Sequence, residues 1–231
     1  SQAKTINGAD VLFYIGQDLE PWLEKALKSR DSNSVVIALG DMPNLNQLEA
    51  RELDEFGASH EDHGHDHSHD HEALYDPHMW LDPSNALIWL DIITDILENA
   101  DPDNKLVYRA NLARSQNEIT VARKNTTRAL APFADLKLIV THDSTHYFED
   151  AFGLTVIGAF SASDGQNAGA RSLNTLLGQL GPDTCVVEDI AHPSRITANL
   201  PENVRHVTID PMGYGQLGEG YYPQLLNTLT Q

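Results

Sequence analysis

The second half of the chain alternates short apolar, often β-branched runs with helical segments. Strands are predicted over 136–141, 155–160, 184–187 and 204–209, with helices over 147–152, 168–180 and 221–229 and a helical stretch from Pro193. This alternation is typical of a parallel sheet covered by helices, because parallel strands need crossover connections. Ligands of such sheets bind beyond the carboxyl ends of the strands, so the pattern also predicts where a site lies.

The first half has a similar but shorter pattern. Strands are predicted over 11–15 and 35–39, and a helix capped by Asp18 is expected to run to about Lys28. The polar segment 44–55 is expected to be partly helical. Asp82 followed by Pro83 is typical of a helix start, with Asp at the N-cap and Pro at the first helical position.

A long helix is predicted between the two halves. It begins near Pro102, and neither Pro nor Gly interrupts it before Pro132. About 28 helical residues would span about 40 Å. A helix of this length favours a link between two lobes over one helix of a bundle. We therefore expect an α/β fold with an N-terminal lobe (1–102, with a His-rich loop at 57–74), a linking helix (103–132) and a C-terminal lobe (133–231).

The composition disfavours or excludes several classes of partner and site. There are 34 Asp and Glu against 15 Lys and Arg, giving a formal net charge of −19, which disfavours nucleic acid as a partner. No apolar run is long enough for a transmembrane helix. Cys185 is the only cysteine, so a structural zinc site built on two thiolates is excluded, and we expect this side chain to be a small buried hydrophobe.

Residues 60–71 form a run in which histidines alternate with carboxylates. Six of the eleven histidines lie here: His60, His63, His65, His67, His69 and His71. Imidazole is a common ligand of zinc, copper and nickel, and neighbouring carboxylates concentrate cations. Burying so many polar rings would leave many without partners, so we expect a flexible, exposed loop that binds metal weakly as an accessory site.

Polar residues follow three predicted strands of the C-terminal sheet. These are His142, the pair Glu188-Asp189, and Asp210. Together with His78 from the first half, His142 and Asp210 make a His/His/Asp set at the cleft between the lobes. Nitrogen-rich sets with one carboxylate suit zinc, whereas oxygen-rich sets suit manganese.

Each of these residues also has a simpler interpretation. His78 could be a packed loop histidine, and Asp210 a turn residue before Pro211. His146 stands four residues after His142, the spacing of paired zinc ligands on a helix, but the intervening Glu of a zinc protease is absent. His192 and His206 are expected to be surface or strand-edge residues.

Three ordered segments resemble the metal-binding solute-binding proteins of ABC transporters, specifically the zinc (ZnuA-like) branch. They are Asp76-Pro77-His78-Met79-Trp80-Leu81-Asp82-Pro83, Val140-Thr141-His142-Asp143 with Tyr147-Phe148 and Phe152-Gly153-Leu154, and Thr208-Ile209-Asp210-Pro211-Met212-Gly213. The early segments Gly8-Ala9-Asp10-Val11 and Leu19-Glu20-Pro21-Trp22-Leu23 are similar too. The resemblance extends over essentially the whole chain.

The resemblance implies two α/β lobes, a rigid linking helix and one Zn²⁺ held between the lobes by His78, His142 and Asp210. It also implies an exported, periplasmic protein that captures zinc and delivers it to a membrane ABC permease. Manganese-preferring relatives place a Glu where His142 stands and usually lack the His-rich insertion. The family's first strand and first His ligand lie upstream of the point matching Ser1, so we expect both to be missing from this sequence.

Other functions are weighed against this one. The nearest alternative is a manganese-binding solute-binding protein. Two alternatives belong to other classes of protein. One is a zinc hydrolase with Glu188 or Asp189 as general base, and the other is a His-rich metal-storage or adhesion protein. We expect a monomer that is not an enzyme, with a periplasmic zinc metallochaperone as a candidate donor. Deleting residues 60–71 distinguishes these functions: a storage protein would lose its bound metal, whereas a zinc-capture protein would keep one tight site in the cleft.

Overall fold

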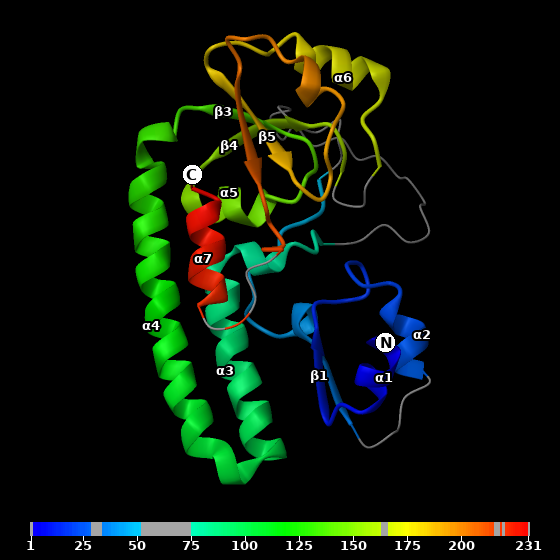
Figure 1. Ribbon diagram of the computed structural model, residues 1–231, viewed down its shortest axis with the longest axis vertical. Helices are drawn as coiled ribbons and strands as arrows, with labels where there is room; N and C mark the ends of the chain where they lie inside the picture. Colours follow the sequence, from blue (N-terminus) through cyan, green and yellow to red (C-terminus); the bar gives the residue numbers. More distant parts are fainter. Residues whose placement is uncertain are drawn as a thin grey trace.

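The computed structural model describes residues 2–28, 34–51, 75–162, 166–214, 218 and 220–230. Two α/β lobes lie at different heights beside a long helix pair (Figure 1). This arrangement agrees with the fold class predicted from the sequence. The histidine run 60–71 lies outside the described residues.

The N-terminal lobe contains a two-stranded parallel sheet. Its elements are α1 (Gln2–Asn7), β1 (Val11–Tyr14), α2 (Leu23–Lys28) and β2 (Val35–Ala38). The helix expected from Asp18 begins only at Leu23, because Pro21 disfavours a helical backbone at the residue before it, Glu20. The Glu20 carboxylate accepts hydrogen bonds from the backbone of Ile15 and Gly16 at 2.8 and 3.2 Å. No helix forms over 44–51, where Glu49 bridges Tyr75 in antiparallel fashion.

Two antiparallel helices connect the lobes. α3 (Pro83–Ala100) begins as predicted, with the Asp82 carboxylate accepting a hydrogen bond from the Ser84 N–H at 2.7 Å. α4 (Lys105–Leu130) has 26 residues, slightly fewer than expected, and short 3₁₀ turns flank it at Pro102–Asn104 and Ala131–Phe133. It runs along one side of the molecule from the foot of α3 to the C-terminal sheet (Figure 1).

The C-terminal lobe is built on a parallel sheet in the order β4-β3-β5-β6. Its elements are β3 (Lys137–Val140), α5 (His146–Phe152), β4 (Thr155–Ala159), α6 (Ala170–Leu177), β5 (Thr184–Asp189), β6 (Arg205–Ile209) and α7 (Tyr221–Thr228). The helical stretch expected from Pro193 reduces to one 3₁₀ turn, Thr197–Asn199. Here the Glu188 carboxylate accepts hydrogen bonds from the Ser194 N–H and the Thr197 hydroxyl, which compete with helical pairing.

The main hydrophobic core lies where the two lobes and the helix pair meet. It combines buried residues of both halves: Leu39, Met79, Leu81, Trp89, Ala122, Tyr147, Phe148, Leu225, Leu226 and Leu229. Cys185 is buried and free, and burial raises the pKa of its thiol. Among the described residues, no helix is both long and apolar enough to cross a membrane.

Partly buried hydrogen bonds cross between the halves of the chain near this core. The Leu48 N–H donates to the Tyr147 hydroxyl at 2.9 Å, and the Trp80 indole donates to the Pro211 carbonyl at 2.9 Å. The Tyr222 hydroxyl donates to the Trp80 carbonyl at 2.7 Å. These contacts hold the segment around residues 76–82 against the carboxyl edge of the C-terminal sheet.

Candidate metal site

The carboxyl ends of three adjacent strands bring the predicted polar residues to one edge. His142 follows β3, Asp189 ends β5 and Asp210 follows β6. Pairing continues one residue past the end of β5, because the Ile190 N–H donates to the carbonyl of Ile209, the last residue of β6, at 3.0 Å. The strand-end placement predicted from the sequence is therefore what the sheet produces.

His78 is buried and held by a carboxylate two residues before it. One oxygen of Asp76 accepts a hydrogen bond from the His78 backbone N–H at 2.8 Å and lies 2.8 Å from the ring Nδ1. A carboxylate at Nδ1 stabilises the tautomer that carries hydrogen there, which leaves the Nε2 lone pair for a metal. The short loop Asp76-Pro77-His78 thus contains both a candidate ligand and the group that orients it.

His142 is also buried, and a hydroxyl orients it. The Ser161 hydroxyl donates to the Thr141 carbonyl at 3.0 Å, so its oxygen is free to accept from His142 Nδ1 at 3.3 Å. Burial, with smaller contributions from the rings of His192 and His78, lowers the pKa of His142 to about 4. The imidazole is therefore neutral at pH 7, the form that binds metals.

The structure brings His78 and His142 together from different halves of the chain. Their ring centroids lie 5.5 Å apart in an edge-on arrangement. Asp210 stands at the same sheet edge, and one of its carboxylate oxygens is buried without a hydrogen-bond partner. A buried unpaired carboxylate oxygen fits a cation ligand, and the place of Asp210 in the ligand set stays a prediction.

A second group of potential ligands shares His142. Ligand atoms of His142, Asp189 and His192 all lie within 4.8 Å of one another. The sequence predicted His192 only as a surface or strand-edge residue. Its side chain is indeed half exposed, but its ring centroid lies 4.0 Å from that of His142. The signal for it in the sequence is a His three residues after a strand-end carboxylate.

Two other histidines, His146 and His206, each face a carboxylate. His146, at the start of α5, has Nδ1 3.8 Å from the second oxygen of Asp76, and both atoms are buried without hydrogen-bond partners. Burial, assisted by the nearby Arg51 charge, lowers the pKa of His146. His206 instead faces Glu188, with Nε2 3.1 Å from a carboxylate oxygen.

A charged clamp stands beside the imidazole pair. The Arg51 guanidinium binds Asp143, the neighbour of His142, through Nε at 3.1 Å and through a shorter Nη2 contact, and it binds Glu149 through Nη1 at 2.8 Å. Burial disfavours the charged guanidinium, but the hydrogen bonds that it donates to Glu149 and Asp143 outweigh burial and raise the pKa of Arg51. The clamp connects the first half of the chain to the β3–α5 loop.

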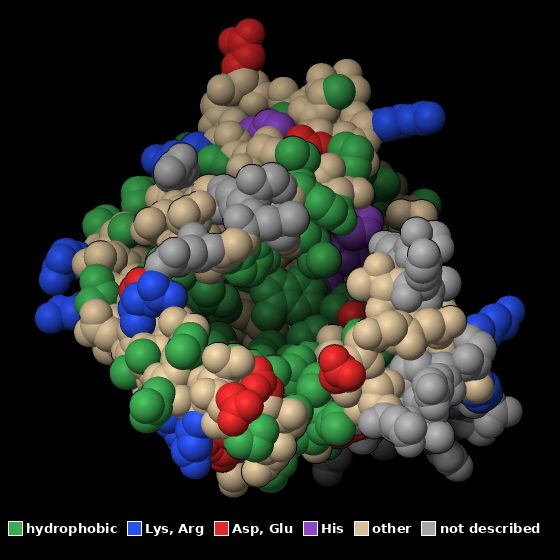
Figure 2. All heavy atoms as spheres, turned by 60° about the horizontal axis from the view of Figure 1, so that its bottom comes forward, with side chains coloured by type: hydrophobic (Ala, Val, Ile, Leu, Met, Phe, Trp, Pro, Cys, Tyr) green, Lys and Arg blue, Asp and Glu red, His purple; other side chains and the backbone are tan. Residues whose placement is uncertain are grey.

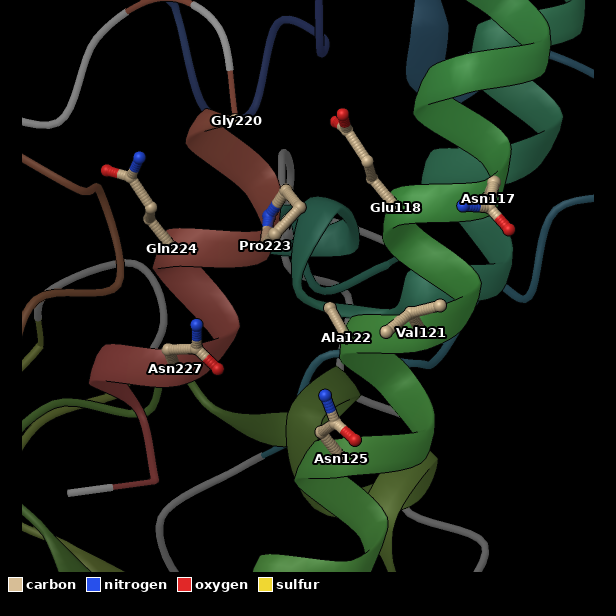
Figure 3. A pocket seen from close by; sticks show the side chains of 9 residues that line it. All are labelled: Asn117, Glu118, Val121, Ala122, Asn125, Gly220, Pro223, Gln224 and Asn227. Atoms are coloured by element: carbon tan, nitrogen blue, oxygen red, sulfur yellow. The ribbon is translucent and has the colours of Figure 1, made fainter.

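The hollows in the surface are lined by different kinds of side chain. Figure 2 shows a hollow with mostly hydrophobic side chains inside and histidine side chains at its rim. A separate cavity of about 390 Å³ lies between α4 and α7, lined largely by amides such as Asn117, Asn125, Gln224 and Asn227 (Figure 3). Glu118 is the carboxylate among its lining residues and no histidine lines it, so this cavity has no zinc ligand set.

Comparison with known proteins gives the family. A family model described as zinc-uptake complex component A, periplasmic (ZnuA), matches residues 1–231. The chain is 32% identical to the high-affinity zinc uptake system protein ZnuA of Paracoccus denitrificans (strain Pd 1222), covering 100% of this chain and 77% of that protein. It is 31% identical to ZnuA of Yersinia pestis, covering 100% of this chain and 76% of that protein.

Solved structures share the fold. A crystal structure of ZnuA superposes with a TM-score of 0.73 at 22% identity, covering 100% of this chain and 81% of that one. A zinc-bound deletion mutant of ZnuA gives 0.74 at 21% identity, with 100% and 79% covered. FpvC from Pseudomonas aeruginosa in complex with Mn²⁺ gives 0.72 at 19% identity, with 99% and 81% covered. Because both metals occur on this fold, the fold alone does not select the metal.

The two lobes, the linking helix pair and the histidines at the lobe junction define a metal-binding solute-binding protein of the ABC-transporter type. Within that class, the chain belongs to the zinc-uptake component ZnuA family. The family resemblance stated from the sequence motifs is confirmed.

Proposed function

We propose that this protein captures Zn²⁺ outside the inner membrane and delivers it to a membrane ABC permease for import. The observation that carries the proposal is the buried pair His78 and His142, whose rings lie 5.5 Å apart at the lobe junction. Both rings are held through Nδ1, so both Nε2 atoms are free for one metal ion. Membership of the ZnuA family supports zinc as the cargo.

The donor set favours zinc over manganese. Two imidazoles with one carboxylate, Asp210, match the nitrogen-rich sets of zinc, whereas manganese prefers carboxylates and other oxygens. A cargo site needs no open coordination position for a reacting water. We therefore place His78, His142 and Asp210 in the resident zinc site, with the six histidines of 60–71 as weak accessory ligands.

Zinc affinity tests the resident site. Competition with a chelator of known affinity is expected to show one tight zinc site, which His78→Ala and His142→Ala each weaken by at least about 100-fold, as loss of a metal ligand does. His206→Ala is the control, since His206 contacts Glu188 away from the pair. Unchanged zinc affinity in both site variants would exclude this site.

Deletion of residues 60–71 separates transport from storage. A zinc-capture protein should keep its tight site after the deletion and lose only weak, additional zinc, whereas a storage protein should lose most of its bound metal. Equilibrium dialysis followed by metal analysis gives the number of zinc ions bound per protein. Growth under zinc limitation of cells that carry the variant lacking residues 60–71 tests zinc delivery. Loss of the tight site on deletion would favour storage by the histidine run.

A further inference from the structure

The three residues His142, Asp189 and His192 form a compact donor group beside the resident pair. Their ligand atoms lie within 4.8 Å of one another, close enough to converge on one metal ion. Two imidazoles and one carboxylate again make a set suited to zinc. His142 belongs to both groups, with the His78 ring 5.5 Å away and the His192 ring 4.0 Å away.

Asp189 is held as a metal-binding carboxylate would need to be. Its side chain is 5% exposed, and one oxygen accepts a hydrogen bond from the Ala191 N–H at 2.8 Å. The other oxygen lies 3.2 Å from His192 Nδ1 and 3.4 Å from the Ser144 hydroxyl. The Asp189 backbone N–H donates to the Thr141 hydroxyl at 3.0 Å, which ties the end of β5 to the residue before His142.

The two groups differ in access to solvent. The side chain of His192 is 50% exposed, whereas that of His78 is 7% exposed. An ion arriving from solvent can therefore meet His192 before it meets His78. Because His142 has a single free nitrogen, Nε2, it can serve one metal position at a time.

We propose that His142, Asp189 and His192 form an outer, transient zinc position from which the ion moves to the inner position at His78. The inference rests on the proposed function for the existence of the inner site. His142 would remain bound throughout the transfer, while His192 and Asp189 are exchanged for His78 and Asp210. Such a stepwise exchange of ligands avoids releasing a bare ion, and it would accelerate both capture and release.

Kinetics distinguishes a transfer position from a resident ligand. A residue that binds zinc only in an intermediate changes the forward and reverse rates by the same factor and leaves the equilibrium constant unchanged. We expect His192→Ala to slow zinc capture and chelator-driven zinc release equally, by about tenfold or more, a modest change in barrier. Asp189→Asn should act in the same direction, and His206→Ala is the matched histidine control.

Stopped-flow mixing of the full chain with zinc and a fluorescent chelator measures both rates. Unchanged rates in His192→Ala would overturn the proposal. A weaker zinc affinity with unchanged capture would also overturn it, because His192 would then be a ligand of the resident site.

A His78→Ala background tests the outer position by itself. This variant should retain a weak zinc site that a further His192→Ala change weakens by about tenfold or more, whereas a further His206→Ala change should not. Equal zinc affinity of His78→Ala and His78→Ala/His192→Ala would exclude the outer position. Failure of the proposed function is recognised separately, by unchanged affinity in both single variants His78→Ala and His142→Ala.

Discussion

At the scale of single residues, the proposed metal site contains two groups placed to orient its imidazoles. Asp76 contacts His78 Nδ1 at 2.8 Å, and Ser161 contacts His142 Nδ1 at 3.3 Å. Both contacts leave Nε2 as the free nitrogen. The two rings therefore present lone pairs before an ion arrives, which reduces the entropy that binding has to overcome.

Asp76 should act as a positioning residue for zinc. Asp76→Asn keeps the size of the side chain but weakens the hydrogen bond to His78 Nδ1, and we expect zinc affinity to fall by about 10- to 100-fold, as for other outer partners of metal-binding histidines. The change removes one charge, so the control is the same change at Asp91, an exposed α3 residue that contacts Gln116 at 3.1 Å. An equal loss of affinity in both variants would indicate a charge effect instead.

The burial of neutral His142 should make the metal-free protein acid-sensitive. Its pKa is lowered from an ordinary 6.5 to about 4 in the folded state, first by burial and then by the neighbouring rings. The unfolded chain binds the proton more readily than the folded protein does. The stability that neutral His142 contributes is therefore complete above pH 6.5 and is lost as the pH falls toward 4. Between pH 7 and 5 the difference corresponds to a loss of about 2 kcal/mol.

Urea unfolding of the protein and of His142→Gln, both in the presence of a chelator, measures this loss. The free energy of unfolding should fall by about 2 kcal/mol more in the parent than in the variant over the interval from pH 7 to 5. Parallel pH dependences of the two proteins would contradict the assignment of the acid sensitivity to His142.

At the scale of elements, the β3–α5 loop is held by the Arg51 clamp. Arg51→Leu would leave Asp143, whose side chain is fully buried, and Glu149, whose side chain is 7% exposed, without their cation. Removing one partner from a buried ion pair typically costs about 3–5 kcal/mol. We expect a loss of that order in unfolding free energy, measured by urea denaturation.

Arg109→Leu is the matched control for the clamp. Arg109 also binds two carboxylates, Asp95 and Glu98, but its side chain is 47% exposed. Solvent screens such a pair, so this variant should lose much less stability. If the two variants lose equal stability, the clamp at the lobe junction has no special role.

At the scale of the whole molecule, both lobes contribute to the main core, and two further hydrophobic clusters lie within the C-terminal lobe. Leu225 and Leu226 of α7 are fully buried in the cluster that also contains Leu39 and Trp89 of the N-terminal half. We therefore expect one cooperative unfolding transition instead of two. Coincident transitions by tryptophan fluorescence and far-UV circular dichroism are the test.

Leu225→Ala should destabilise this shared core by about 2–5 kcal/mol, the usual cost of a cavity. The transition should remain single, because both lobes lose the same contacts. The control is Leu106→Ala, since Leu106 is 84% exposed on α4. Two separate transitions in Leu225→Ala would show that the lobes are stable independently.

Much of the fold could be predicted from local patterns. The strands of the C-terminal sheet, the Asp82 cap of α3 and the long helix before Pro132 all have signals within a few residues of where they form. The helix predicted from Asp18 begins late, at Leu23, and the helical stretch predicted from Pro193 is reduced to one 3₁₀ turn. Pro21 disfavours a helical backbone at Glu20, and the Glu188 carboxylate binds the Ser194 N–H, a side-chain contact that leaves no periodic signal.

The sequence by itself determined the residue types and strand-end positions of His142 and Asp210, because these are local properties, and the proposed metal chemistry follows from them. The division into lobes 1–102 and 133–231, with helix 103–132 between them, remains a proposal. Only the tertiary structure decided which side chains meet: His78 with His142 across the junction, and His192 with Asp189 beside them. Such contacts depend on how separate elements pack, and no spacing along the chain encodes the distance between residues 78 and 142.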